Sequence, residues 1–326
     1  MGPFGIGLIG AGRMGRTHLR ALAGSDLVEV TAVAEMSPTA RQAVVGIETY
    51  ASVAEMLDHA KLDGVLIAAP TDQHGAVIAE VAVRGLPILC EKPCGLTADA
   101  ARESARTAAA AGVPLQVAYW RRFVPGLREL HDRIAAGELG VIHLITCYQW
   151  DEQPPSPVFR AHSGGIAIDM GVHEFDQLRW LTGQDITGLA AVSSGSAPDG
   201  IPDVDGAQVV LSLSGGATGF VSLGRYFRLG DAVWAEAFGT GGHERVDVID
   251  PAEGEVAQLE ALRRQAESFA AYAGGDGPCE GATAADAVAA LAAAEQVTAT
   301  ITARRGPNAP DVSAGLPPSY RHQAGG

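Results

Sequence analysis

Basic side chains are scarce in this sequence. Its 326 residues include 23 Lys and Arg against 38 Asp and Glu, which gives a formal net charge of −15. No run of basic residues interrupts this acidity, and such a surface repels the phosphate backbone of DNA or RNA. The charge therefore argues against a nucleic-acid partner, and against an anionic substrate drawn in by long-range attraction.

Cysteines and long apolar runs are also few. The four cysteines are scattered and lack the paired spacing of a zinc site: Cys90, Cys94, Cys147 and Cys279. Reduced thiols in a cytoplasmic protein without a metal are the simplest interpretation. The first residues, MGPFGIGLIGAG, have no basic leader and only a short apolar run. We therefore expect neither a signal peptide nor a membrane segment.

The length favours two domains. Up to residue 120, short apolar runs alternate with helical patterns, which is typical of a parallel sheet with helices on both faces. The apolar runs lie at 4–9, 28–34, 64–68, 87–90 and 114–118. We assign residues 1–122 to this first domain.

The pattern changes after residue 122. A helix near 125–136 precedes a β-like run at 141–150, a proline-rich loop and a helix at 163–181. Several strands between 188 and 239 follow without intervening helices, which favours a mostly antiparallel open sheet. Two alanine-rich helices, near 255–273 and 283–304, complete a second domain at 123–305. A Pro/Gly-rich stretch, typical of a flexible tail, occupies 306–326.

The first apolar run leads into a glycine-rich turn, GAGRMG, at residues 10–15. Gly10 permits a tight turn, Gly12 lets the backbone approach a pyrophosphate, and Gly15 lets the next helix pack closely on the strand. Arg13 and Met14 lie at the N-terminus of that helix, whose N–H groups would face the phosphates. A glycine-rich turn without a ligand is the alternative. The strand, turn and helix in sequence favour a dinucleotide site.

Glu35 ends the second apolar run, at the position where an acid can accept hydrogen bonds from both hydroxyls of the adenosine ribose. A carboxylate there would repel a 2′-phosphate. The following residues, MSP, offer no arginine to pair with such a phosphate, so NAD is favoured over NADP. Arg13 and Arg41 are the side chains that could weaken this preference.

Two more loops follow apolar runs, at the strand ends where ligands of parallel sheets bind. In the first loop we expect Pro70 and Thr71 to line the cofactor, whereas His74 could touch it or cap the next helix. In the second loop, Glu91 and Lys92 fall where a nicotinamide would lie. The alternative for Lys92 is an ordinary loop lysine.

The helix expected at 163–181, SGGIAIDMGVHEFDQLRWL, carries Asp169, His173 and Asp176 within about 60° of one another. Three interpretations fit this stripe: a solvated face, a pair of metal ligands, or an acid–base pair in a cleft. Nothing like H-E-x-x-H or a Cys/His cluster completes a metal site. An acid–base pair needs a partner from elsewhere in the chain, and Lys92 is the candidate. We assign Asp176 to capping or a core hydrogen bond rather than to catalysis.

Three separated motifs resemble those of the Gfo/Idh/MocA family of NAD(P)-dependent oxidoreductases, which act on sugars and cyclitols. They are G-A-G-x-M-G at 10–15, E-K-P at 91–93 and G-G-x-x-x-D-x-G-x-H at 164–173. The resemblance implies an N-terminal Rossmann domain and a C-terminal α/β domain with a large, mostly antiparallel open sheet. It also implies a homodimer or homotetramer.

Within that family the chain is most similar to inositol 2-dehydrogenases. The resemblance implies that Lys92, Asp169 and His173 form the catalytic set and also bind the substrate. It further implies that Trp120 and Arg121 flank the substrate.

The sequence departs from that pattern on the substrate side. Tyr119 and Trp120 stand where the motif shows Phe and Met, Val124 replaces an Asp, and LGDA at 229–232 replaces Tyr-Gly-Tyr-Asp. We expect an NAD-dependent dehydrogenase that transfers a hydride between a secondary alcohol of a cyclitol or sugar and the nicotinamide. The alternatives are a pyranose, keto-sugar or aminocyclitol substrate, or a dinucleotide-sensing regulator without catalysis.

Overall fold

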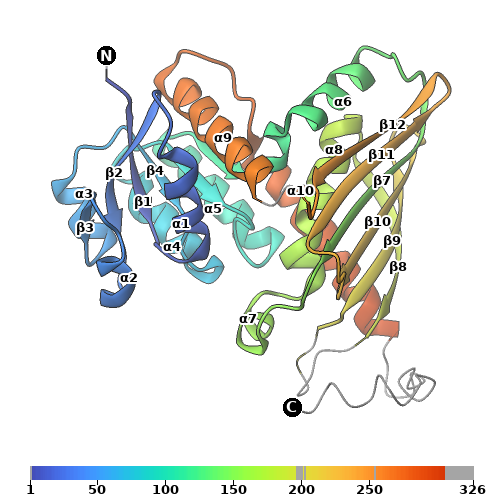
Figure 1. The fold of residues 1–326 in the computed structure, drawn as a ribbon, viewed down its shortest axis with the longest axis horizontal. Coiled ribbons are helices and arrows are strands. Elements are labelled where there is room, and N and C mark those ends of the chain that lie inside the picture. Colours follow the sequence, from blue (N-terminus) through green and yellow to red (C-terminus); the bar gives the residue numbers. More distant parts are fainter. Residues whose placement is uncertain (1, 196–200, 202, 253–254, 305–326) are drawn as a thin grey trace. The chain divides into compact units, whose positions relative to one another are not determined.

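The computed structural model describes residues 2–195, 201, 203–252 and 255–304 (Figure 1). The chain forms two compact units, one of residues 1–129 and 253–292, the other of residues 130–252 and 293–326. The tail expected at 306–326 lies outside the described residues. Among the helices that the structure describes, none is long and apolar enough to cross a bilayer.

Seven strands form the sheet of the first unit, in the order β13-β6-β5-β4-β1-β2-β3. All neighbours are parallel except β13, which runs antiparallel to β6. The strands are β1 (Phe4–Ile9), β2 (Val28–Ala34), β3 (Glu48–Tyr50), β4 (Gly64–Ile67), β5 (Ile88–Glu91), β6 (Leu115–Ala118) and β13 (Ala282–Thr283). This is the doubly wound order, in which the connections reverse direction between β1 and β4 and a ligand crevice forms there.

Polar side chains cap three helices of this unit, α2, α3 and α5. The side chains of Ser37, Ser52 and Thr97 each accept a backbone N–H from three residues further on. The helical segments are α1 (Arg13–Leu22), α2 (Pro38–Gln42), α3 (Val53–His59), η1 (Thr71–Gln73), α4 (His74–Ala82), α5 (Ala98–Ala111), η2 (Trp120–Phe123) and α9 (Val256–Gly274).

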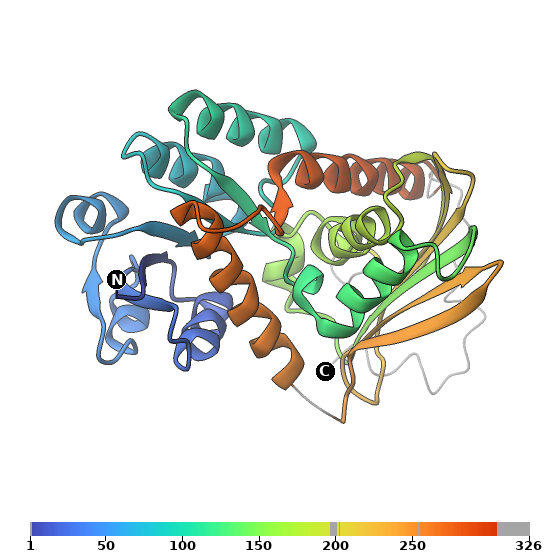
Figure 2. The same ribbon diagram turned by 90° about the horizontal axis from the view of Figure 1, so that it is seen from above.

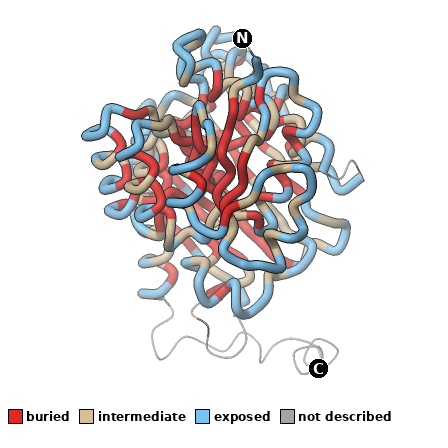
Figure 3. The backbone as a smooth tube through the Cα atoms, turned by 90° about the vertical axis from the view of Figure 1, so that its left-hand side faces the viewer, coloured by how far each residue is buried: buried red, intermediate tan, exposed pale blue. Residues whose placement is uncertain are grey.

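The central strands β1, β4 and β5 are buried almost throughout, as expected for a sheet covered by helices on both faces (Figure 3). One core cluster joins Ile6 and Leu8 of β1 to Phe269 of α9. Helix α9 packs beside α1, as both ribbon views show (Figures 1 and 2). The structure therefore differs from the boundary expected at 122/123, because α9 and β13 belong to the first unit.

The second unit contains a six-stranded sheet, in the order β12-β11-β7-β10-β9-β8. Only β7 and β10 are parallel neighbours, so the predicted mostly antiparallel sheet is confirmed. Helix α8 packs on β7 and β10. The strands are β7 (Ile142–Asp151), β8 (Ile186–Ser194), β9 (Gly206–Leu213), β10 (Thr218–Arg225), β11 (Ala232–Gly239) and β12 (Gly242–Ile249).

Among the described residues, three helical segments lie wholly in the second unit: α7 (Pro157–His162), the π-helical turn η3 (Ala167–Gly171) and α8 (Val172–Thr182). The boundary between the units falls within α6 (Pro125–Ala135) and within α10 (Ala284–Arg304). Helix α7 occupies part of the segment expected to be a proline-rich loop, because Ser156 caps it and Pro157 fits its first position.

Candidate active site

The glycine turn after β1 has two glycines that the fold requires and one that it does not. Gly10 has φ of +94°, and a Cβ there would approach the carbonyl oxygen of Ala68 to 2.7 Å. A Cβ on Gly15 would overlap the carbonyl oxygen of Gly10, whereas a Cβ on Gly12 would meet nothing within 4 Å. No side chain caps α1 at Gly12. Open space therefore lies before the N-terminus of α1, which fits a dinucleotide phosphate. Arg13 and Met14 begin this helix, as predicted.

Glu35 connects the glycine turn to the end of β2. Its carboxylate accepts the N–H of Ala11 at 2.7 Å and that of Ser37 at 2.8 Å. Each carboxylate oxygen keeps further acceptor capacity, so Glu35 can also accept ribose hydroxyls. Arg41 donates to the backbone oxygen of Glu35 at 2.6 Å, which holds a guanidinium group beside this site.

His74 links two loops of the first unit. Its Nδ1 lies 2.9 Å from the oxygen of Pro93 and its Nε2 lies 2.9 Å from the oxygen of Ala69. Burial lowers the pKa of His74, although both carbonyls favour the charged ring. His74, the first residue of α4, is buried and thus connects the loop after β4 to the loop after β5 through these two contacts. Pro70 is exposed beside it, and Thr71 begins η1.

Lys92 follows β5 and is half-buried beside a buried polar pair. Its backbone N–H donates to Glu91 Oε2 at 3.1 Å, and Glu91 Oε1 lies 2.6 Å from Nε2 of His18. Sequence analysis missed His18. The available signal was its position three residues after Gly15 on the buried face of α1, where an apolar residue is expected.

The residues expected to flank the substrate in this unit lie on η2. Trp120 and Arg121 are both buried, and the Arg121 guanidinium carbon lies 5.8 Å from the Trp120 ring centre. Arg122 forms an ion pair with Asp286 at 3.4 Å.

Glycines shape the motif of the second unit. Gly164 and Gly165 have φ of +81° and +85°, a region that favours glycine. The oxygen of Gly165 accepts the N–H of Ile168 at 3.1 Å and of Asp169 at 2.9 Å, which starts η3. The helix expected at 163–181 is therefore a glycine turn and a π-helical turn before α8 begins. Such turns occur often at functional sites.

Asp169 and His173 lie on consecutive turns of this segment. His173 is 6% exposed and Asp176 is 1% exposed, so the interpretation as a solvated face is wrong. The Asp169 side chain is 19% exposed, and Nδ1 of His173 is buried. Within the described ranges, no group of three His, Cys, Asp or Glu could hold a metal ion.

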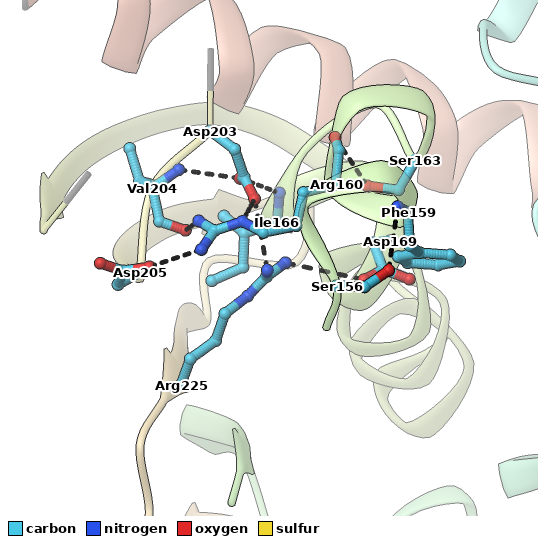
Figure 4. A network of polar contacts seen from close by, with 10 residues as sticks. All are labelled: Ser156, Phe159, Arg160, Ser163, Ile166, Asp169, Asp203, Val204, Asp205 and Arg225. Carbon is cyan, nitrogen blue, oxygen red and sulfur yellow. Dashed lines mark hydrogen bonds and ion pairs between the residues drawn. The ribbon is translucent and has the colours of Figure 1, made fainter. Parts of the chain in front are cut away.

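A buried ionic network reaches Asp169, and sequence analysis missed it (Figure 4). Arg160 Nε donates to Asp203 at 2.7 Å, and Arg225 forms ion pairs with both Asp203 and Asp169. Nearby, burial raises the pKa of Asp151 to about 6, and the charges of Asp231 and Asp169 add to the effect. No local pattern announces these pairs, because Arg160 and Asp203 are 43 residues apart in the chain.

The predicted site residues are divided between the two units. Lys92, Trp120 and Arg121 belong to the first unit with the cofactor-binding candidates, and Asp169 and His173 belong to the second.

Family models match both units. Residues 4–119 match the oxidoreductase family with an NAD-binding Rossmann fold, and residues 127–244 match the GFO/IDH/MocA C-terminal domain. The chain belongs to the Gfo/Idh/MocA family. The predicted family, fold class, NAD cofactor and dehydrogenase class are thereby confirmed.

Two relatives and one solved structure are similar to this chain over most of its length. The rhizopine catabolism protein MocA of Rhizobium meliloti is 50% identical over 91% of this chain and 95% of its own length. An inositol 2-dehydrogenase of Rhizobium meliloti (strain 1021) is 31% identical over 79% of this chain and 80% of its own. The crystal structure of a putative myo-inositol dehydrogenase from Sinorhizobium meliloti 1021 superposes with a TM-score of 0.85 at 28% identity, covering 93% of this chain and 98% of that one.

Proposed function

We propose that this NAD-dependent dehydrogenase oxidises a secondary alcohol of an inositol-like cyclitol, with Lys92, Asp169 and His173 as catalytic residues. The observation that carries the proposal is the glycine-opened helical segment, on which a buried His173 follows a partly exposed Asp169 by one turn. The relative named inositol 2-dehydrogenase supports the substrate class. A cytoplasmic location and a homodimer or homotetramer stay predictions from the sequence.

The first unit would hold the cofactor. The N-terminus of α1 and Gly12 face its phosphates, and Glu35 accepts from the adenosine ribose. The bound NAD supplies the nicotinamide that accepts the hydride. Lys92, at the end of β5, donates a hydrogen bond to the reacting oxygen and stabilises the negative charge that develops on it.

The second unit would move the proton. A neutral imidazole is a general base near neutral pH, so His173 takes the proton of the substrate hydroxyl. We assign the transfer to Nε2, because Nδ1 is buried. Asp169, one turn earlier, orients His173 or a neighbouring hydroxyl of the substrate. In the reverse direction the imidazolium returns the proton.

A substrate with an ammonium group is the second candidate. Asp169 and Asp231 both lie close enough to Asp151 for their charges to raise its pKa, and Asp231 lies in the 229–232 segment that departs from inositol dehydrogenases. The relative at 50% identity is named for rhizopine catabolism rather than for inositol. An aminocyclitol would present a cation to these carboxylates.

The test is the initial rate of NADH formation by the purified protein across inositol stereoisomers, aminocyclitols and pyranoses. His173→Asn, prepared in parallel, controls for contaminating dehydrogenases. We expect the highest kcat/KM with an inositol. A preference for an aminocyclitol selects the second candidate. Tight NAD binding in calorimetry with no turnover of any compound would refute the proposal and favour a regulatory role.

A further inference from the structure

Arg225 is a buried cation that the mechanism above does not use. It is the last residue of β10, and its side chain has no solvent exposure. Its Nη1 lies 3.3 Å from Asp203 Oδ2 and its Nη2 lies 3.7 Å from Asp169 Oδ2 (Figure 4). The guanidinium group therefore stands between a fully buried carboxylate and the carboxylate assigned to the site.

Asp203 is a fixed anchor for this guanidinium. Its Oδ1 accepts the N–H groups of Ile166 at 2.9 Å and Val204 at 2.8 Å, and its Oδ2 accepts Arg160 Nε at 2.7 Å. The N–H of Ile166 belongs to the turn that leads into η3. Asp203 thus holds both Arg225 and the backbone that carries Asp169.

Asp169 is the carboxylate through which this ionic network reaches the candidate site. Arg160 also donates to Asp205 at 2.9 Å and to the oxygen of Val204 at 3.1 Å. Two guanidinium groups, Arg160 and Arg225, therefore face three carboxylates: Asp203, Asp205 and Asp169. Arg160 contacts Asp203 and Asp205, and Arg225 contacts Asp203 and Asp169. Asp203 is therefore common to both arginines, and Asp169 pairs with Arg225.

A second carboxylate interacts with Asp169. Asp151 pairs in register with Arg225 on the parallel strand β7, and its carboxylate interacts with that of Asp169. The charge of Asp169 raises the pKa of Asp151, and the charge of Arg225 opposes that rise. Arg225 is thus a cation that interacts with both carboxylates.

We propose that Arg225 is a positioning residue, which holds the carboxylate of Asp169 in place one turn from His173, with Arg160 and Asp203 as its anchor. The inference rests on the proposed function, since it assumes that Asp169 acts in catalysis. Stability alone is a weak reason for such a cation, because a buried ion pair is often no more stabilising than apolar groups of similar size.

We expect the fold to tolerate removal of this charge. After Arg225→Met, Asp203 keeps Arg160, the partly exposed Asp169 keeps contact with water, and the methionine fills part of the space of the arginine stem. Arg228→Met, at an exposed arginine three residues further on, is a matched control.

The test is a double-mutant cycle between Arg225→Met and Asp169→Asn, measured as kcat and as KM for NAD and for the best substrate of the panel. At metal sites, loss of a residue that orients a ligand side chain typically costs roughly 10–100-fold in activity, and we use the same range for a residue that orients Asp169. We expect Arg225→Met to lower kcat by that factor, to leave KM for NAD unchanged, and to have no further effect in the Asp169→Asn background. Arg225→Lys, which keeps the charge, should recover most of the loss.

Several outcomes would overturn the inference. An equal loss in both Asp169 backgrounds would make Arg225 purely structural, and wild-type kcat in Arg225→Met would remove its role altogether. Wild-type kcat in Asp169→Asn would instead refute the role of Asp169 in the proposed function, and the inference with it. Arg225→Gln gives the same comparison if the methionine variant does not fold.

Discussion

Separate substitutions of Gly12 and Gly15 distinguish a glycine turn that binds a ligand from one that serves only the fold. Gly12 has φ of −66°, which alanine adopts freely, and its added methyl would meet nothing within 4 Å. Gly12→Ala should therefore change the free energy of unfolding by less than about 1 kcal/mol. The methyl enters the space that we assign to the pyrophosphate, and overpacking of this kind costs about 1–3 kcal/mol. The Kd for NAD should rise roughly 5- to 150-fold.

Gly15→Ala should have the opposite signature. Its Cβ would overlap the carbonyl oxygen of Gly10, so α1 or the turn must move before the side chain fits. We expect a loss of about 1–3 kcal/mol or more in the free energy of unfolding of the apo protein. Gly24→Ala, at an exposed glycine whose added methyl also meets nothing, is the control and should change neither quantity.

Urea unfolding without cofactor, followed by circular dichroism, gives the stabilities, and isothermal titration calorimetry gives the Kd for NAD. Wild-type affinity in Gly12→Ala would refute the assignment of the open space to the pyrophosphate. Wild-type stability in Gly15→Ala would show that the close approach to Gly10 is not a constraint of the fold.

Four further predictions concern charge. Glu35→Ser should narrow the preference for NAD over NADP in calorimetry, because it removes the carboxylate that repels a 2′-phosphate. Adding Arg41→Gln should cancel any gain in the affinity for NADP. Equal affinities of the wild type for NAD and NADP would contradict this role of Glu35. Lys92→Ala should lower kcat by roughly 10²–10³-fold with little change in the affinity for NAD. Weaker NAD binding with an unchanged kcat would instead show that Lys92 binds the cofactor. Oxidation by the wild type should rise with pH through one ionisation, and His173→Asn should remove that step and lower kcat by roughly 10²–10⁴; an unchanged profile would mean that another group is the base. The pKa of Asp151 is about 6 in the folded state, above its value of about 4 in an unfolded chain. Its stabilising contribution is complete below pH of about 4 and is lost as pH rises through about 6. Asp151→Asn should therefore stabilise the protein against urea by up to about 3 kcal/mol at pH of about 8 and not at pH of about 4, because one unit of difference between the two pKa values corresponds to about 1.4 kcal/mol. An equal gain at both pH values would exclude the burial effect.

Features that depend on neighbours along the chain can be predicted from the sequence. The apolar run at 4–9, the three glycines and the next helix form one continuous unit, so their pattern predicts strand, turn and helix together. The same holds for Lys92 at a strand end and for Asp169 and His173 four residues apart on a helical segment. The two sheets could be distinguished because helices separate the strands of the first sheet, whereas β8 to β12 of the second follow one another without helices.

Which distant segments meet depends on how the chain folds. The alanine-rich pattern near 255–273 predicts a helix but not the sheet that this helix covers. Helix α9 belongs to the first unit because Phe269 completes the core around β1. The pairing of His18 with Glu91 spans 73 residues, and that of Arg160 with Asp203 spans 43. Contacts between residues so far apart leave no periodic trace in the chain. Their partners are fixed only when burial removes water and each polar group must find a hydrogen bond or an opposite charge.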